Sequence, residues 1–144
     1  MVQQCVVVHW HGIGGRPVAN TPVRDVFAAN RLDGARVIGW LHASDRLWQM
    51  DLLRRQASGT MSEVFGRDRL KHDILMRRLG LRRTSAKWWE SGRVPKQFRA
   101  ELQAYADGVN ARMVRFRKNG WPNIFNELGY QPETWSPVDS IVFT

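Results

Sequence analysis

The stretch from Gly39 to Arg55 reads Gly-Trp-Leu-His-Ala-Ser-Asp-Arg-Leu-Trp-Gln-Met-Asp-Leu-Leu-Arg-Arg, and it determines how the rest of the chain is interpreted. Apolar residues recur in its second half at intervals of three: Leu47, Met50 and Leu53. This spacing predicts an amphipathic helix that begins after Ser44, a typical N-cap residue. We expect Gly59 to end the helix, because glycine adopts the left-handed conformation that follows many helices.

The residues before this helix are expected to be extended and rich in turns. Two β-branched runs, Val6–Val8 and Arg36–Ile38, are separated by several glycines and prolines, which predicts N-terminal strands. Asp45 and Arg46 would then lie at a strand-to-helix junction. A carboxylate in a first helical turn bonds exposed N–H groups, so we expect this pair to organise the junction and to perform no chemistry.

Further helices are predicted downstream. A short one is expected from Thr60 to Phe65, and another near Asp68, with one apolar side made by Leu70, Ile74 and Leu81. The clearest stripe extends over five turns and consists of Phe98, Leu102, Tyr105, Val109, Met113 and Phe116. The tail after Gly120 carries three prolines and is expected to be largely irregular, with a new element beginning near Val138.

Composition and charge exclude several classes of protein. With 144 residues and 43% hydrophobic residues, the chain suits one globular domain. It contains no apolar run of membrane-spanning length and no secretory signal at its start, and a single cysteine, Cys5, excludes an internal disulfide. The net charge of +9 is concentrated between Arg54 and Arg99. This stripe is a solvated face, a surface for an acidic partner or, less favoured, a nucleic-acid site.

The sequence offers weak candidates for chemistry. His9 and His11 would share one face of a strand, but neither they nor His42 and His72 have a third ligand at a metal-site spacing. We therefore expect no metal site in this chain. No serine lies in a nucleophile-elbow motif, so we also expect no catalytic nucleophile.

Several blocks in order resemble the small (alpha) chain of the penicillin amidase family. Beyond Gly39–Arg55, they are Gly59–Gly66, Arg77–Leu81, Leu102–Ala111 and Asn126–Ser140. Residues 1–38, which are expected to form strands and turns, match the family pattern poorly. The resemblance implies that residues 1–144 are a single incomplete domain of a larger precursor.

The resemblance also implies a fold and an activity. The fold class would be α+β, a mostly helical fragment with N-terminal strands, within the αββα four-layer fold of N-terminal-nucleophile hydrolases. The activity would be hydrolysis of an amide between an acyl group and an amine, through an acyl-enzyme. Penicillins, acyl-homoserine lactones and related N-acyl compounds are all open as substrates. The nucleophile would lie outside this chain, which is expected to be inactive alone.

The same resemblance suggests partners and pocket residues. The expected partners are the large (beta) chain of the same precursor and a small N-acyl substrate. Binding to a membrane or to nucleic acid is not expected. Ile38 and Trp40 are candidates for the substrate pocket, and a core position is the alternative for Trp40. The resemblance suggests no cofactor in this chain, and a calcium ion in the complete enzyme.

Overall fold

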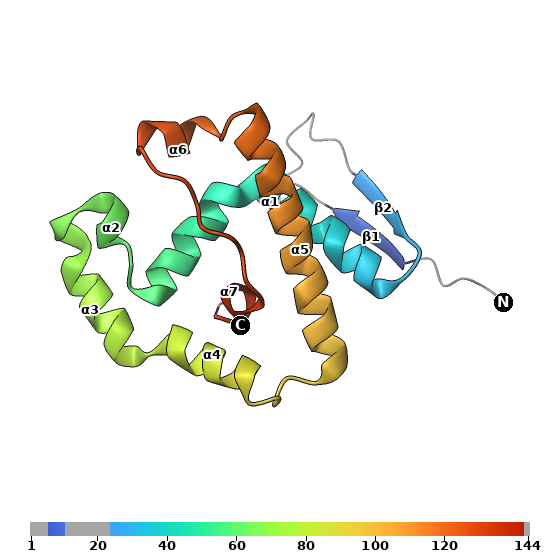
Figure 1. Ribbon diagram of the computed structural model, residues 1–144, viewed down its shortest axis with the longest axis horizontal. Coiled ribbons are helices and arrows are strands. Elements are labelled where there is room, and N and C mark those ends of the chain that lie inside the picture. Colours follow the sequence, from blue (N-terminus) through green and yellow to red (C-terminus); the bar gives the residue numbers. More distant parts are fainter. Residues whose placement is uncertain (1–5, 11–23, 143–144) are drawn as a thin grey trace.

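The computed structural model describes residues 6–10 and 24–142 and, beyond one pair of strands, is mostly helical, as expected (Figure 1). The strands β1 (Val6–Trp10) and β2 (Arg24–Ala28) pair antiparallel, with Val6 opposite Ala28 and Trp10 opposite Arg24. The helices are α1 (Arg31–Ser58), α2 (Ser62–Phe65), α3 (Leu70–Leu79), α4 (Leu81–Glu90), α5 (Lys96–Asn119), α6 (Asn123–Glu127) and α7 (Pro137–Ile141), with a 3-10 turn at Arg67–Arg69.

The two long helices α1 and α5 cross in close contact and form the frame of the molecule (Figure 1). Two glycines make the contact. A Cβ on Gly39 would lie 3.1 Å from the amide nitrogen of Val109, and a Cβ on Gly108 would lie 3.0 Å from the amide nitrogen of Trp40. Because each glycine faces the backbone of the other helix, only residues without a side chain allow the helices to approach so closely.

The first helix begins earlier than the sequence predicts. The strand expected at Arg36–Ile38 is wrong, because α1 starts at Arg31 and includes this run. Its N-cap is Asn30, not Ser44, and the Asn30 side chain accepts a hydrogen bond from the amide of Asp33. Packing against α5 thus overrides the local β preference of Val37 and Ile38.

The predicted boundary near Ser44 corresponds to a kink inside α1. Arg46 has φ −140° and ψ 17°, outside helical values, and divides α1 into two halves. The Ser44 hydroxyl donates to the carbonyl of Trp40 at 2.8 Å, a bond type that bends helices. The end of α1 matches the expectation, since Gly59 is left-handed with φ 67°.

The helix expected from Asp68 is divided into α3 and α4 by Gly80, which is left-handed with φ 70°. Its expected apolar side is not buried, because Leu70, Ile74 and Leu81 are between 41% and 48% exposed. In α5 the predicted stripe is buried at Val109 and Met113, whereas Phe98 is exposed. The interior is therefore formed mainly by α1 and α5.

The core lies between α1, α5 and the C-terminal segment. Its buried apolar residues are Ala43, Leu47, Ala106, Val109, Met113, Phe125 and Trp135. The tail is less irregular than expected, since it carries α6 and α7, and α7 lies inside the arc of α1, α3, α4 and α5 (Figure 1). Ser136 caps α7 through a reciprocal bond with Asp139. In the described part of the chain, no helix has the length and apolar character needed to cross a membrane.

Candidate functional site

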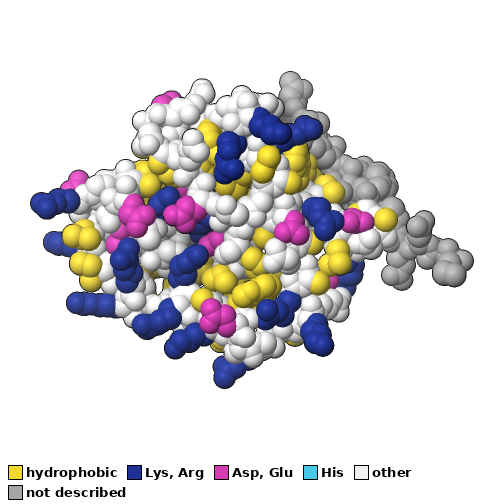
Figure 2. All heavy atoms as spheres, in the orientation of Figure 1, with side chains coloured by type: hydrophobic (Ala, Val, Ile, Leu, Met, Phe, Trp, Pro, Cys, Tyr) yellow, Lys and Arg dark blue, Asp and Glu magenta, His cyan; other side chains and the backbone are white. Residues whose placement is uncertain are grey.

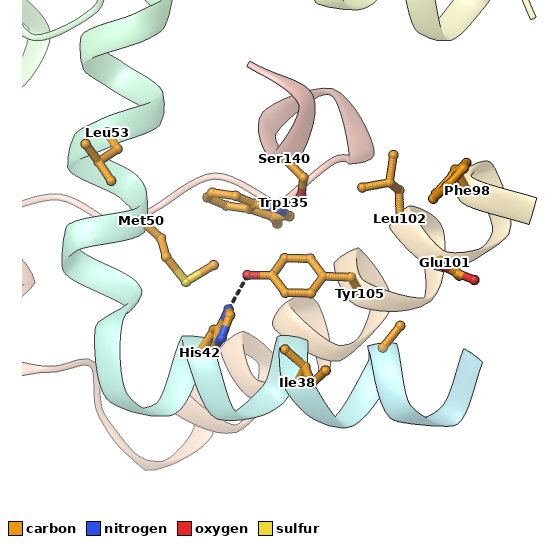
Figure 3. A pocket seen from close by; sticks show the side chains of 11 residues that line it. Ile38, His42, Met50, Leu53, Phe98, Glu101, Leu102, Tyr105, Trp135 and Ser140 are labelled. Atoms are coloured by element: carbon orange, nitrogen blue, oxygen red, sulfur yellow. Dashed lines mark hydrogen bonds between the residues drawn. The ribbon is translucent and has the colours of Figure 1, made fainter. Parts of the chain in front are cut away.

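An apolar cavity of about 430 Å³ opens beside the kink of α1 (Figure 3). The first half of α1 contributes one wall, the second half another, and α5 and the C-terminal segment supply the rest. The lining residues are Ala35, Ile38, His42, Met50, Leu53, Phe98, Glu101, Leu102, Tyr105, Trp135 and Ser140. The kink is what allows both halves of one helix to face the same space.

A pair of neutral polar groups lies within this apolar lining. His42 Nδ1 and the Tyr105 hydroxyl are 2.9 Å apart, and their rings meet edge to face (Figure 3). Burial lowers the pKa of His42 below its usual value of 6.5, and the nearby Arg46 guanidinium lowers it further. Burial raises the pKa of Tyr105 to about 12. Both groups are therefore uncharged at neutral pH.

The acidic residue of the lining is neutralised at the rim. Glu101 Oε1 lies 2.9 Å from the Nε of Arg31, and Gln97 donates to the same carboxylate at 3.3 Å. Leu53 and Phe98, both about half exposed, form other parts of the rim. The cavity thus suits an uncharged apolar group, because its walls offer no unpaired charge to an anion or a cation.

The wall formed by Trp135 is held in place by α5. The Asn110 side chain donates to the Trp135 carbonyl and accepts from its amide, both at 2.8 Å. The Trp135 indole donates to the Ser140 hydroxyl at 3.0 Å. Two hydrogen bonds to a single side chain fix the backbone of Trp135, so this wall is positioned by α5.

A buried cluster of charges attaches the same segment to α1. Asp51, fully buried, is 2.6 Å from Arg54 Nη2 and 3.0 Å from Arg55 Nε, and it accepts a hydrogen bond of 2.6 Å from the Tyr130 hydroxyl. Arg54 also donates to the carbonyl of Glu133 at 2.7 Å. Each charge has a partner, which burial requires.

The cluster extends to α4 and α7 through Asp139. This buried carboxylate pairs with Arg82 and lies 3.7 Å from Arg54. Its second role is to accept from the amide of Ser136 at 2.7 Å, which completes the capping box of α7. One group of charges thus joins α1, α4 and α7.

The two expected pocket residues are placed differently. Ile38 lines the cavity, whereas Trp40 does not. The Trp40 ring packs under the guanidinium groups of Arg112 and Arg115, at 5.4 and 5.5 Å. Trp40 therefore contacts α5, and the substrate-pocket roles of Ile38 and Trp40 both stay predictions.

Asp45 and Arg46 do not lie at a strand-to-helix junction, because the residues before them are helical. Both lie at the kink instead, and their organising role stays a prediction. The side chains of His9 and His11, and the whole of Cys5, lie outside the described residues. His72 is 3.7 Å from Asp73. The described residues bring together no group of three metal-ligating side chains.

Sequence analysis missed the charge cluster and the polar pair. Asp51, Arg54 and Arg55 have the spacing of neighbours on one helix face, which is a usable signal for an ion pair. Their burial could not be read from it, because arginine and aspartate are usually exposed. His42 and Tyr105 are 63 residues apart, and no local pattern connects them.

Comparison with known proteins gives consistent results. The family model for penicillin amidase matches residues 20–144. Penicillin acylase 2 proenzyme from Pseudomonas sp. (strain SE83) is 38% identical over 116 residues, which cover 79% of this chain and 14% of that protein. Acyl-homoserine lactone acylase QuiP from Pseudomonas aeruginosa is 38% identical over 108 residues, covering 75% of this chain and 12% of that protein.

A solved structure shares the fold. Thermostable penicillin G acylase from Alcaligenes faecalis matches with a TM-score of 0.69 and 25% sequence identity, over 99% of this chain and 70% of that chain. The chain spans about one seventh of the length of the curated relatives it matches. Because the family model extends from the second strand to the C-terminal residue, with the long helices and the cavity between them inside it, this chain belongs to the penicillin amidase family.

Proposed function

We propose that this chain is part of an acylase that hydrolyses the amide between an acyl group and an amine, and that its cavity forms one wall of the acyl-binding pocket. The cavity beside the kink of α1 is the observation that carries the second half of this proposal. The first half rests on the relatives, whose names describe penicillin acylases and acyl-homoserine lactone acylases. Penicillin and acyl-homoserine lactone amides are therefore the first substrates to test.

The size and chemistry of the cavity support an acyl group as ligand. A space of about 430 Å³ falls within the usual range of small-molecule pockets. Contact of a hydrocarbon chain or a phenyl ring with the apolar side chains of Ile38, Met50 and Leu102 would remove apolar surface from water and so favour binding. The neutral pair of His42 and Tyr105 adds polar atoms without a charge.

In this proposal, the chemical step takes place on a part of the protein outside this chain. A nucleophile there attacks the amide carbonyl, forms an acyl-enzyme and releases the amine, and water then releases the acid. N–H donors outside this chain stabilise the oxyanion. The helices described here pack against an αββα core and hold the acyl group in place.

The described residues do not fit a calcium site by themselves. Calcium requires six to eight oxygen ligands, usually with several carboxylates. The buried carboxylates are already bonded, Asp51 and Asp139 to arginines and Asp73 to the amides of Met61 and Ser62. A calcium ion in the complete enzyme would need its ligands from elsewhere.

The test fills the cavity in the complete enzyme. Leu102→Trp places a large ring into the space between α1 and α5, and Val114→Trp adds the same ring to an exposed position of α5 as a control. Both variants are assayed with amides of short and long acyl groups. We expect Leu102→Trp to lower kcat/KM for long or aromatic acyl groups by about tenfold or more relative to short ones.

The control should keep the acyl preference of the unmodified enzyme. If Leu102→Trp matures normally and leaves the preference unchanged, the cavity has no part in acyl binding. If the complete enzyme hydrolyses no amide of either type, the acylase proposal itself is wrong.

A further inference from the structure

The Tyr105 hydroxyl brings an open hydrogen-bonding position into the apolar cavity beside the kink of α1. In Figure 3 it points from α5 toward His42 and Met50 of α1. Within the described residues its hydrogen-bond partner is His42 Nδ1, at 2.9 Å. A tyrosine hydroxyl both donates and accepts hydrogen bonds. A single bond therefore leaves part of its capacity for a ligand.

The other polar side chains of the described lining are already engaged. The Ser140 hydroxyl accepts a hydrogen bond from the Trp135 indole at 3.0 Å. The Glu101 carboxylate lies 2.9 Å from the Nε of Arg31 and also accepts from Gln97. The Tyr105 hydroxyl is therefore the best-placed polar group for a ligand that enters between α1 and α5.

The neutral state of His42 makes this hydroxyl adaptable. Burial and the nearby Arg46 lower the pKa of His42, so its ring is uncharged at neutral pH. A neutral imidazole carries its proton on either nitrogen. With the proton on Nε2, Nδ1 accepts from Tyr105, and the tyrosine oxygen is able to accept from a ligand hydroxyl. With the proton on Nδ1, the histidine donates to the tyrosine oxygen, and the phenol proton is available to a ligand carbonyl.

A purely hydrocarbon ligand would leave this hydroxyl buried without a second partner. An alkyl chain that fills the space of about 430 Å³ removes water from Tyr105. A polar group that loses a hydrogen bond to water and gains none in return costs free energy. A ligand oxygen at the same place restores the lost bond, so an oxygen substituent binds better there than a hydrogen atom.

The charge of the ligand is limited by the same lining. Figure 2 shows Lys and Arg side chains along the outer edge of the molecule. Among the described residues that line the cavity, by contrast, there is no Lys or Arg, and Glu101 is negative and already paired with Arg31. A carboxylate at the end of an acyl chain would enter this space without a counter-ion, which an apolar environment disfavours. The oxygen that fits is therefore neutral, as in a ketone or an alcohol.

We propose that the Tyr105 hydroxyl, oriented by His42, binds a keto or hydroxyl oxygen on the acyl group of the substrate. The inference rests on the proposed function, because the acyl group must occupy this cavity. It narrows the substrate class to amides whose acyl chain carries a neutral oxygen substituent beyond the amide carbonyl. Tyr105 is a specificity-determining residue here and takes no part in breaking the amide bond.

The test uses the complete enzyme and amides of one chromogenic amine. Acyl chains of equal length are compared without a substituent, with a keto or hydroxyl group moved carbon by carbon along the chain, and with a terminal carboxylate. We expect kcat/KM to be about tenfold higher for the substituted chain at one or two neighbouring positions, which is the size of one hydrogen bond to an otherwise unsatisfied buried group. The chain with the carboxylate should be the poorest substrate.

Tyr105→Phe removes the hydroxyl and keeps the ring. It should abolish the preference for oxygen, mainly through a higher KM for the substituted chain, because the hydroxyl contacts a part of the substrate that does not react. Tyr130→Phe is the matched control, since that hydroxyl bonds to Asp51 at 2.6 Å and Tyr130 does not line the cavity. The control should keep the preference. His42→Phe leaves the Tyr105 hydroxyl without its partner and should weaken the preference.

Two results would overturn the inference. The first is equal kcat/KM for substituted and unsubstituted chains at every position in the unmodified enzyme, a comparison that needs no variant to mature. The second is a preference that survives Tyr105→Phe, or survives His42→Phe where Tyr105→Phe does not mature. A loss of kcat/KM that is equal for all chains belongs to the second result, because it indicates a structural bond between α1 and α5. In each case amides are still hydrolysed and the proposed function stands. If the complete enzyme hydrolyses none of these amides, the proposed function fails and the inference fails with it.

Discussion

Replacing Gly108 by alanine tests the close crossing of α1 and α5. A Cβ at this position would lie 2.8 Å from the carbonyl carbon of Arg36 and 3.0 Å from the amide nitrogen of Trp40, and it would be closer still to the Arg36 carbonyl oxygen. Both neighbours are backbone atoms and cannot rotate away. The helices must therefore separate, which opens gaps along the rest of their contact.

The magnitude follows from two opposed effects. Alanine is favoured over glycine inside a helix by about 1 kcal/mol. Forcing an extra carbon into a packed interior costs about 1–3 kcal/mol, and a clash with backbone belongs at the upper end. We therefore expect Gly108→Ala to lower the free energy of unfolding by about 2 kcal/mol, or the melting temperature by roughly 6 °C.

Gly34→Ala is the matched control. Gly34 is also buried and also inside a helix, α1, but a Cβ there would lie 3.6 Å from the Cβ of Ala28, an ordinary contact. Only the helix preference then acts, so this variant should be more stable by up to about 1 kcal/mol. Urea unfolding followed by tryptophan fluorescence measures both. A Gly108→Ala chain as stable as the unmodified one would refute the close crossing.

Four further outcomes are expected. The purified 144-residue chain should hydrolyse no amide, and activity abolished by mutating one of its own residues would contradict this. The same chain should bind a hydrophobic dye through its exposed apolar surface, and a monomer with a sharp melt and no dye signal would count against it. Asp51→Ala should cost about 3–5 kcal/mol in urea unfolding, because it leaves two buried arginines without their carboxylate. Unfolding free energy should fall as pH is lowered below 6.5, since unfolded His42 takes up a proton before the folded residue does, and His42→Phe should remove part of this slope.

The presence of the helices was predicted better from the sequence than the residues at which they begin. The ends of α1 and α5 were correctly placed at Gly59 and Gly120, because a glycine after a helix is a local signal. The start of α1 was not, because Asn30 caps it and contact with α5 keeps a β-branched segment helical. Such a contact joins residues about 70 positions apart and leaves no local pattern in a single sequence.

Only part of the candidate site could be predicted from the sequence. Ile38 could be proposed from family resemblance, and it lines the cavity. Nothing in the sequence distinguished Trp40 from Ile38 as a pocket residue. In the structure the Trp40 ring faces arginines of α5, whereas the Ile38 side chain faces the cavity. The remaining walls come from α5 and the C-terminal segment, and only the crossing of two helices and a buried charge cluster bring them together.

The bend in α1 affects the shape of the cavity, but the residues at the bend are not the residues that line the cavity. Ile38 lies on one side of the bend and Leu53 on the other, so the width between them depends on the angle at Arg46. That angle is influenced by the Ser44 hydroxyl, which bonds to the Trp40 carbonyl and is absent from the cavity lining. Two chains with the same wall residues can therefore differ in cavity width through a single hydroxyl, and a comparison restricted to lining residues would overlook the cause.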